Sequence, residues 1–449
     1  MNQTLIGICG FLCMAAIMLS LFKSKTVPAV AFILFPTILG IFLITWGGGY
    51  YSIADLGNLI KAGFGSTAPT AALFMFSVLY FSVMNEASMF SVMVDRLTRH
   101  IGTSVIGVTM ITTILTIAAH LDGSGASTFL IVIPAMLPIY RKMNMRTTTL
   151  LRVMVLPMGI MNLMPWAGPM VRAATVLGVE AGDLWQMILP VQIFGVIICL
   201  AHGVLAGIQE KQLGAGLVRE QNFKSPEVDD KSPRDKKIFI FNVLLTLAVI
   251  ATLIVTKIPD YVPFMVGLSL ALIANYGLDA KTHKKIINAH AAPALMMCST
   301  LLAAAVLMGI FVKEVTVDGA KIPSVINCMS NLVTLILPET FGEHLPVIIG
   351  ALSVPLALIF DTNSYFYGML PVMIGIGENF GVSAESITAV MLICRNCATF
   401  ISPMVPAALL GVGLAEVDIK EHIKASFGFA WLLSIICLGF AALIKIIPL

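Results

Sequence analysis

Charged residues are scarce in this chain. Only 11% of its 449 residues are Asp, Glu, Lys or Arg, whereas 58% are hydrophobic, and an ordinary soluble domain carries about 25% charged residues. No region is both long enough and polar enough to fold as a separate water-soluble domain. The composition therefore predicts a polytopic helical membrane protein, and the formal net charge of +3 gives no reason to expect a nucleic-acid partner.

Several patterns that would indicate enzymatic or redox chemistry are missing as well. The sequence has no G-x-x-x-x-G-K-[ST] nucleotide-binding motif and no His-rich or Cys/His cluster with metal-ligand spacing. The eight cysteines are scattered, and the one C-x-x-C, from Cys394 to Cys397, lies in a predicted membrane helix without a βαβ context. We therefore expect no catalytic residues, no covalent cofactor and no disulfide framework.

The N-terminus lacks the basic segment of a cleavable signal peptide. Its first positive charges, Lys23 and Lys25, follow the first apolar run instead of preceding it. We expect this run to be a first transmembrane helix with its N-terminus outside the cell.

Long apolar runs, in contrast, are abundant. Two segments, 147–178 and 385–413, are long enough to span a membrane but are interrupted by Pro and Gly. Two others, 103–140 and 345–377, each have two arms of about 13–18 residues around a polar tip, and at ~1.5 Å per residue such arms reach mid-bilayer and return. These two are predicted re-entrant hairpins. Uninterrupted runs of spanning length lie near 3–21, 27–46, 69–90, 184–208, 239–256, 260–278, 291–312 and 424–447.

The order of these segments is repeated. Each half contains three helices, a hairpin, a broken helix and a final helix, and the halves match at an offset of about 238 residues. Each half crosses the membrane five times, which is an odd number, so the repeats must be inverted relative to each other. We therefore predict an all-α protein with a first inverted repeat at 1–208, a charged cytoplasmic linker at 209–237 and a second inverted repeat at 238–449.

The placement of the basic residues supports this topology. With the linker in the cytoplasm, 20 of the 27 Lys and Arg residues fall inside and five fall outside, as the positive-inside rule requires. Both termini are then outside. The remaining two basic residues, Arg172 and Arg395, lie within the broken helices.

Two aspartates lie at the hairpin tips, where a membrane protein ordinarily has no charge. Asp122 opens the segment LDGSGAST and Asp361 opens FDTNSYFY, and each precedes its proline-rich break, PWAGP at 165–169 or SPMVP at 402–406, by about 40 residues. Polar, broken backbone at membrane depth is stable only where it lines a protected cavity. A duplicated pair of such breaks indicates the binding site of a transporter.

The two arginines indicate an anionic substrate. An arginine inside a membrane is costly unless it is paired or solvated, and guanidinium forms two parallel hydrogen bonds with a carboxylate. A broken helix also presents free N–H groups that attract anions. The structural alternative is an internal ion pair, for example between Arg172 and Asp122 or between Arg395 and Asp361.

The hairpin tips offer different chemistry. Carboxylate, hydroxyl and carbonyl oxygens are hard ligands for Na⁺, Mg²⁺ or Ca²⁺, and a buried carboxylate can instead carry a proton. The residues alone leave both alternatives open. They predict two pseudosymmetric sites, each made of a tip and a break. His120 is a further candidate, with a packing role as its alternative.

The segments LDGSGASTFLIVIPAMLPIY, GIMNLMPWAGPMVRAATVLGV and SPMVPAALLGVGLAEVDIKEH resemble the CitMHS family of citrate–metal complex:proton symporters, within the ion transporter superfamily. The resemblance covers essentially the whole chain. It implies a homodimeric carrier in the bacterial inner membrane, with a fixed scaffold and a moving domain that carries the hairpins. It also implies a role in the substrate site for Pro165, Gly168, Pro169 and Arg172. The family pattern has LDGDG and PWGGP where this chain has LDGSG and PWAGP, so a carboxylate is missing at Ser124. The missing carboxylate leaves room for a monovalent cation, a proton alone or a smaller carboxylate.

These observations together predict a secondary active importer of citrate or a related di- or tricarboxylate. The cargo is free or metal-complexed, transport is coupled to H⁺ or Na⁺, and access alternates by an elevator-type movement. An exchanger of inorganic anions, or of cations against protons, is the alternative on the same fold, followed by a channel. The expected residues for the co-transported cation, proton or metal are Asp122 and Asp361, with Ser124 and Thr362. The expected substrate contacts are Arg172, Arg395, Asn162, Asn396, Gly168, Pro169, Ser402, Ser127, Thr128, Asn363 and Ser364.

Overall fold

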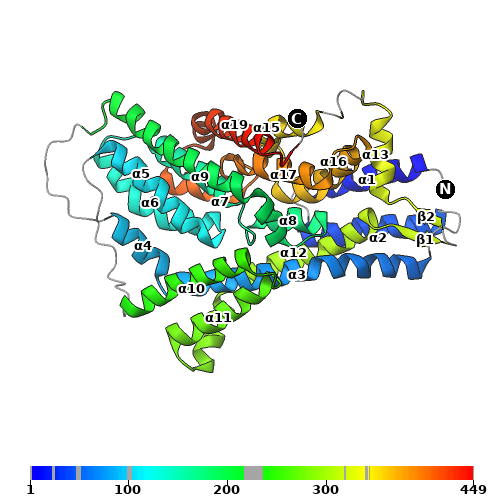
Figure 1. Cartoon of the computed structure of the whole chain (residues 1–449), viewed down its shortest axis with the longest axis horizontal. Coiled ribbons are helices and arrows are strands. Elements are labelled where there is room, and N and C mark those ends of the chain that lie inside the picture. Colours follow the sequence, from blue (N-terminus) through cyan, green and yellow to red (C-terminus); the bar gives the residue numbers. More distant parts are fainter. Residues whose placement is uncertain are drawn as a thin grey trace.

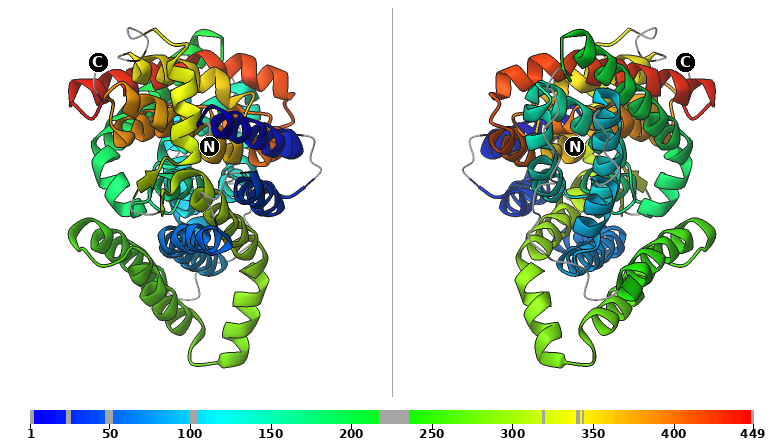
Figure 2. Two further views of the ribbon diagram at one scale, coloured as in Figure 1. Left: turned by 90° about the vertical axis from the view of Figure 1, so that its right-hand side faces the viewer. Right: turned by 90° about the vertical axis from the view of Figure 1, so that its left-hand side faces the viewer.

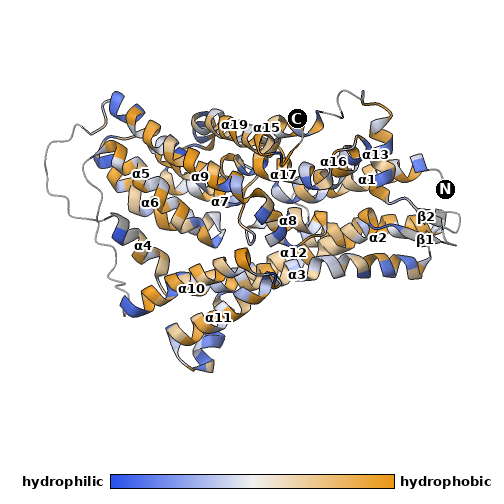
Figure 3. Ribbon diagram, viewed as in Figure 1, coloured by the Kyte–Doolittle hydropathy of each residue, from blue (hydrophilic) through white to orange (hydrophobic). Residues whose placement is uncertain are grey.

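The computed structural model describes residues 3–22, 26–46, 52–98, 104–216, 236–317, 320–338, 342 and 344–447, and most of them are helical (Figure 1). Nine helices in this part of the chain are long and apolar enough to cross a membrane. Hydrophobic residues cover the bodies of these helices, and hydrophilic residues gather mainly at helix ends (Figure 3). The chain is therefore a multi-pass membrane protein, as the composition predicts.

The described residues of the first half form helices and no strands. An amphipathic helix that the sequence pattern did not predict, α4, follows the third long helix. The elements are α1 (Gln3–Phe22), α2 (Pro28–Trp46), α3 (Ile53–Glu86), α4 (Met89–Thr98), α5 (Val105–Ala119), the 3₁₀ turn η1 (His120–Asp122), α6 (Gly125–Lys142), α7 (Thr147–Met161), α8 (Gly168–Leu177) and α9 (Ala181–Gln212). Because α9 extends to Gln212, the first residues of the predicted linker are helical, and residues 217–235 lie outside the described part.

The second half follows the same order, with one insertion. A two-stranded antiparallel hairpin, β1 (Val315–Val317) and β2 (Ala320–Ile322), precedes the short helix α13 (Val325–Thr334), and these strands are the exception to an all-helical chain within the described residues. Segments this short carry no usable periodicity. The other elements are α10 (Lys236–Val255), α11 (Tyr261–Tyr276), α12 (Ala280–Val312), α15 (Leu345–Ala357), the π-helical turn η2 (Ser364–Met369), α16 (Leu370–Asn379), α17 (Ala384–Asn396), the 3₁₀ turn η3 (Thr399–Ile401), α18 (Pro406–Ala415) and α19 (Ile419–Leu443).

The long helices α3 and α12 pack along each other at one side of the molecule (Figure 1). Glycines permit the close approach: a Cβ on Gly63 would lie 2.0 Å from the carbonyl oxygen of Ala305, and one on Gly309 would lie 2.3 Å from that of Leu59. Small residues at such crossings let helices in a membrane associate through tight packing. Helices α10 and α11 project from this side. They form one arm of a V, and the start of α12 forms the other arm (Figure 2).

A second group of helices contains the proline-rich segments. Helices α5, α7 and α9 pack together, as do α15, α17 and α19, and α8 contacts both α3 and α17. Several polar contacts connect the two groups. The backbone N–H of Gly182 at the start of α9 donates to the Asp260 carboxylate before α11 at 2.5 Å, and Gln186 of α9 donates to the carbonyl oxygen of Leu253 on α10 at 3.2 Å. The functional candidates lie in the second group.

Candidate functional site

Two helices end and restart in the middle of the second group. Helix α7 ends at Met161 and α8 begins at Gly168; α17 ends at Asn396 and α18 begins at Pro406. We call the intervening residues 162–167 break 1 and 397–405 break 2. Proline has no N–H to continue a helix but fits its first turn, and Pro169 and Pro406 occupy the first turns of α8 and α18. The breaks therefore fall where the prolines predict them.

The two broken helices cross at Gly159. A Cβ at this position would lie 2.4 Å from the carbonyl oxygen of Asn396 and 3.1 Å from the Cα of Cys397. The backbone of α7 thus touches the backbone at the end of α17, immediately before break 2. This contact brings the two breaks into one region.

We expect Gly159→Ala to destabilise the protein, because the facing atoms are backbone and cannot rotate away. Overpacking of this kind costs about 1–3 kcal/mol, which we expect to appear as a lower melting temperature of the purified protein and reduced uptake. Gly413→Ala in α18 is the matched control, since a Cβ there meets no atom within 4 Å. Equal melting temperatures for Gly159→Ala and wild type would contradict the crossing.

Arg172 connects α8 to the second tip, the segment around Asp361 between α15 and η2. Its Nε donates to Asn363 Oδ1 at 2.7 Å, and one terminal nitrogen donates to the carbonyl oxygen of Gly168 at 2.7 Å. The other terminal nitrogen lies 3.7 Å from the sulfur of Met297 on α12, a weak acceptor. The side chain is buried, and the partners of all three guanidinium nitrogens are neutral.

Arg395 reaches the same tip from α17. Its two terminal nitrogens donate to the hydroxyls of Thr399 and Thr362, both at 3.0 Å, and its Nε has no partner within the described residues. The side chain is fully buried, and the guanidinium carbon lies 5.6 Å from the centre of the Tyr365 ring. Arg172 and Arg395 therefore converge on neighbouring tip residues, Asn363 and Thr362.

Asp361 fixes the shape of this tip. Its carboxylate accepts the backbone N–H of Asn363 at 2.8 Å and that of Ser364 at 3.2 Å, and it also accepts the Ser364 hydroxyl. No carboxylate in the described part of the chain lies within 4.0 Å of Arg172 or Arg395. Neither of the alternative ion pairs is formed.

The first tip, the segment around Asp122 between α5 and α6, is organised differently. The Asp122 carboxylate accepts the backbone N–H of Ser124 at 2.8 Å, and Gly123 adopts φ +69°, where a side chain would be strained. The Ser124 side chain caps α6 by accepting the N–H of Ser127 at 3.3 Å. Thr128 donates to the carbonyl oxygen of Ser124 at 2.9 Å. This tip carries hydroxyls and a carboxylate and has no arginine contact.

His120 joins the first tip to break 1. Its ring nitrogens hydrogen-bond with Thr128 Oγ1 at 2.7 Å and with Asn162 Oδ1 at 3.3 Å, and Trp166 donates to the carbonyl oxygen of Leu121 at 2.8 Å. The His120 ring also packs edge-to-face on Phe400 of break 2, with ring centres 5.3 Å apart. His120 thus connects one tip with both breaks through two hydrogen bonds and a ring contact, as a hydrogen-bonded packing histidine would.

The second tip is joined to both breaks as well. Ser402 in break 2 donates to the carbonyl oxygen of Ala357 at 2.6 Å, and Asn363 accepts from Arg172 after break 1. The two tips and two breaks therefore form one connected region. It contains all the predicted substrate and coupling residues, but the arrangement is asymmetric: both arginines serve the second tip. The prediction of two equivalent sites does not hold for them.

Several buried polar atoms in this region lack a partner within the described residues. They are Arg395 Nε, Asn396 Nδ2, Ser127 Oγ and Tyr367 Oη. Buried polar groups in native folds are nearly always hydrogen-bonded, and an exception indicates a water, ion or ligand. All four can donate, so they suit a ligand rich in oxygen acceptors.

Sequence reasoning missed some members of the region. Thr399 donates to Asn396 Oδ1 at 3.1 Å and also accepts from Arg395, while Tyr365 and Tyr367 are buried beside the arginines. The sequence did contain signals for these residues: a hydroxyl four residues after Arg395 and two tyrosines shortly after Asp361. Polar side chains in an apolar segment require partners, so each of them could have been included in the site.

No group of three or more His, Cys, Asp or Glu side chains in the described residues could hold a metal ion. Asp122 and Asp361 each face hydroxyl or backbone groups as a single carboxylate. A divalent cation held by protein ligands alone ordinarily needs more oxygen ligands than one carboxylate supplies.

Comparison with known proteins identifies the class first. The fold is similar to the crystal structure of the YdaH transporter of Alcanivorax borkumensis, with a TM-score of 0.62 and 14% sequence identity, over 94% of this chain and 100% of that one. The fold is thus that of a polytopic membrane transporter.

The family follows from the sequence. The citrate transporter family, CitMHS, matches residues 4–394. The chain is 28% identical to a citrate transporter of Bacillus subtilis (strain 168) over 99% of this chain and 100% of the relative. It is 31% identical to the Mg²⁺/citrate complex secondary transporter of the same organism, over the same shares. The chain belongs to the citrate transporter family, whose members are secondary transporters and not enzymes.

Proposed function

We propose that this chain is a symporter that imports citrate or a closely related di- or tricarboxylate, free or complexed with a divalent metal, together with H⁺ or Na⁺. The observation that carries the proposal is the pair of buried arginines, Arg172 and Arg395, which meet at one hairpin tip with no carboxylate of the described residues within 4.0 Å of either. Buried guanidinium groups without a close anion favour an anionic ligand.

The geometry suits a polycarboxylate better than a single small anion. The arginines approach adjacent residues from different helices, so two carboxylates of one ligand can each meet a guanidinium. The first turns of α8 and α18, at the ends of the two breaks, add N–H groups and a partial positive charge. Gly168 and Pro169 belong to one of these turns. The unpartnered Nδ2 of Asn396 adds a further donor.

We assign coupling to the first tip. Asp122 has no arginine contact among the described residues; its carboxylate accepts the Ser124 N–H, and the Ser127 hydroxyl lies beside it. A carboxylate with hydroxyl neighbours can bind Na⁺ or carry a proton. Asp361, which organises the arginine-bearing tip, links the cation to the substrate region. Mg²⁺ enters this scheme as part of the cargo, as the name of the Mg²⁺/citrate relative states for that protein.

Movement of the second helix group against the first would give alternating access. We propose that α5–α6 and α15–α16 are re-entrant hairpins, and that the two halves are inverted repeats. The tightly packed α3–α12 pair would be the core of the fixed scaffold of an elevator, in a homodimer within the bacterial inner membrane, with the linker cytoplasmic and both termini outside. Glycine-mediated packing of α3 on α12 supports a rigid scaffold.

Ligand-dependent thermal stabilisation of the purified protein tests the proposal. Ligands stabilise the state that they bind, by about 2.7 kcal/mol at a hundredfold excess over Kd. We expect citrate or a near relative to raise the melting temperature, monocarboxylates to fail, and Mg²⁺ or Na⁺ to enlarge the shift if either is co-bound. Stabilisation by phosphate or sulfate, with no shift from any di- or tricarboxylate, would favour the inorganic-anion exchanger instead.

A further inference from the structure

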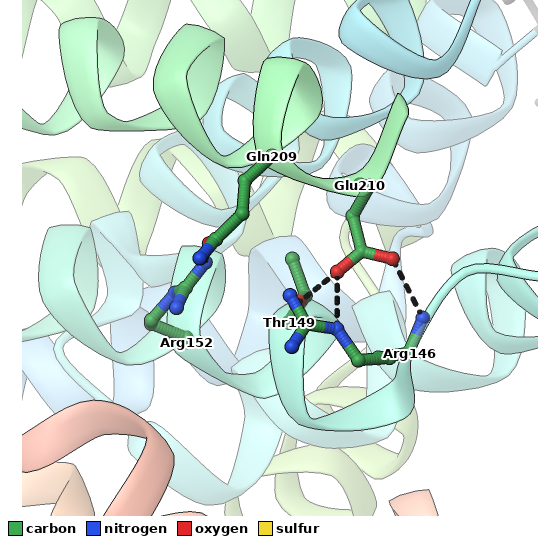
Figure 4. Close-up of polar contacts among 5 residues, drawn as sticks. All are labelled: Arg146, Thr149, Arg152, Gln209 and Glu210. Atoms are coloured by element: carbon green, nitrogen blue, oxygen red, sulfur yellow. Dashed lines mark hydrogen bonds and ion pairs between the residues drawn. The ribbon is translucent and has the colours of Figure 1, made fainter. Parts of the chain in front are cut away.

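A second group of basic side chains, two of them buried, lies away from the tips, at the opposite end of α7. It comprises the half-exposed Arg146 and the buried Arg152 and His202. Figure 4 shows the two arginines with Gln209 and Glu210 from the end of α9. We call the region where these side chains meet Phe429 of α19 the α7–α9 crevice. Nothing in the transport scheme uses it.

Both carboxylate oxygens of Glu210 accept hydrogen bonds from Arg146 or Thr149. Its buried carboxylate accepts the Nε of Arg146 at 2.7 Å, the backbone N–H of Arg146 at 3.0 Å and the Thr149 hydroxyl at 2.6 Å. Glu210 thereby caps the start of α7 and balances one arginine. Figure 4 shows the Arg146 guanidinium reaching past Glu210 toward Arg152.

Arg152 has no such partner. It is only 5% exposed, it donates to Gln209 Oε1 at 2.7 Å, and its Nε is unpartnered. Its guanidinium carbon lies 4.2 Å from the centre of the Phe429 ring of α19. No carboxylate in the described residues lies within 4.0 Å of it, so its charge is not neutralised by the protein.

His202 adds further unpartnered groups. It is 8% exposed, and neither ring nitrogen has a hydrogen-bond partner within the described part. Its ring packs edge-to-face on Phe429, the residue that Arg152 also contacts, with ring centres 5.1 Å apart. Arg152 and His202 thus both rest on Phe429 and leave nitrogen atoms without acceptors. A buried site with excess positive charge and free donors suits an anion.

The surroundings indicate which anion. Large apolar side chains are exposed on α9 and α19 beside the crevice, including Leu205 at 63%, Leu432 at 57% and Phe429 itself at 36%. In a membrane protein such faces contact lipid tails. Arg146, whose side chain is 47% exposed, lies at the start of α7, and we expect the ends of membrane helices to lie at the level of the polar headgroups. Basic pockets between membrane helices at this level bind lipid phosphates.

We propose that the α7–α9 crevice binds the phosphate of an anionic phospholipid, with Arg152, His202 and Arg146 as its donors. The lipid would supply the missing counter-charge and connect α7, which leads to break 1, with α9 and α19. The ligand is distinct from the transported anion in both place and chemistry. A zwitterionic lipid should bind less well, because its cationic headgroup would face Arg146.

The test compares the melting temperature of the full-length protein in nanodiscs of phosphatidylcholine with that in nanodiscs containing phosphatidylglycerol. We expect phosphatidylglycerol to raise the melting temperature of wild type by about 3–5 °C. Arg152→Met and His202→Phe should abolish the difference. Arg141→Met is the control: it removes one positive charge near the same end of the bundle, from an exposed pair with Glu416, and should keep the difference.

Each outcome decides the proposal. If the phosphatidylglycerol effect survives in both Arg152→Met and His202→Phe, the crevice is not the lipid site. If inorganic phosphate added to phosphatidylcholine nanodiscs reproduces the full shift, the site takes free phosphate and the lipid assignment is overturned. If Arg152→Met does not fold, His202→Phe decides, because its ring can keep the contact with Phe429. Uptake of carboxylates is not part of this measurement, so its result is independent of the transport proposal.

Discussion

Arg172→Lys is expected to lower carboxylate uptake about 10- to 100-fold while the protein remains folded. A hydrogen bond to a charged group contributes about 1.5–3 kcal/mol, and each 1.4 kcal/mol is a factor of ten in affinity. Lysine keeps the positive charge but cannot hold Asn363, Gly168 and a ligand carboxylate with one rigid group. The loss should therefore appear mainly as weaker substrate binding.

Uptake of labelled citrate into proteoliposomes measures this effect, and the melting temperature without ligand reports folding. Arg141→Lys is the matched control, since Arg141 is exposed and pairs with Glu416 at 2.7 Å outside the site. It should transport like wild type. An Arg172→Lys protein with normal uptake would return Arg172 to a structural role, in which it only connects α8 to the second tip.

Much of the fold could be predicted from the sequence, because membrane helices are long and their composition is distinctive. The prolines indicated the two breaks, since a missing N–H ends a helix whatever surrounds it. The charged tips at Asp122 and Asp361 were visible because such residues are rare in apolar segments. Helix α4 and the β1–β2 hairpin were missed, as short segments with mixed polarity have no periodic signal that separates them from loops.

The arrangement of the site was harder to predict from the sequence than the fold. The repeat suggested equivalent sites, yet at an offset of about 238 residues Arg172 corresponds to Leu410 and Arg395 to Pro157. The arginines are therefore not symmetry mates, and only the fold brings both to Asn363 and Thr362. Helix crossing at Gly159 decides this convergence. Contacts between residues about 200 positions apart leave no trace in local sequence patterns.

Asp122→Asn is expected to abolish gradient-driven accumulation of substrate while exchange of internal for external substrate continues. The amide oxygen can still accept the Ser124 N–H that shapes the tip, so the tip and the distant arginines should keep their geometry. What the substitution removes is the negative charge that binds a proton or Na⁺. Without that charge the loaded carrier can still reorient, but the cation gradient no longer drives it.

Proteoliposomes loaded with unlabelled citrate separate the two activities, because labelled citrate enters by exchange without any gradient. Asp361→Asn is the informative comparison. Asp361 accepts two backbone N–H groups and a hydroxyl at the tip that both arginines contact. A single amide oxygen cannot replace that carboxylate, so both activities should fall to background. Undiminished accumulation by Asp122→Asn would refute the coupling role. If accumulation by wild type follows an imposed pH gradient in the absence of Na⁺, the carboxylate carries a proton; if it requires a Na⁺ gradient, Asp122 and its neighbouring hydroxyls are ligands of that ion.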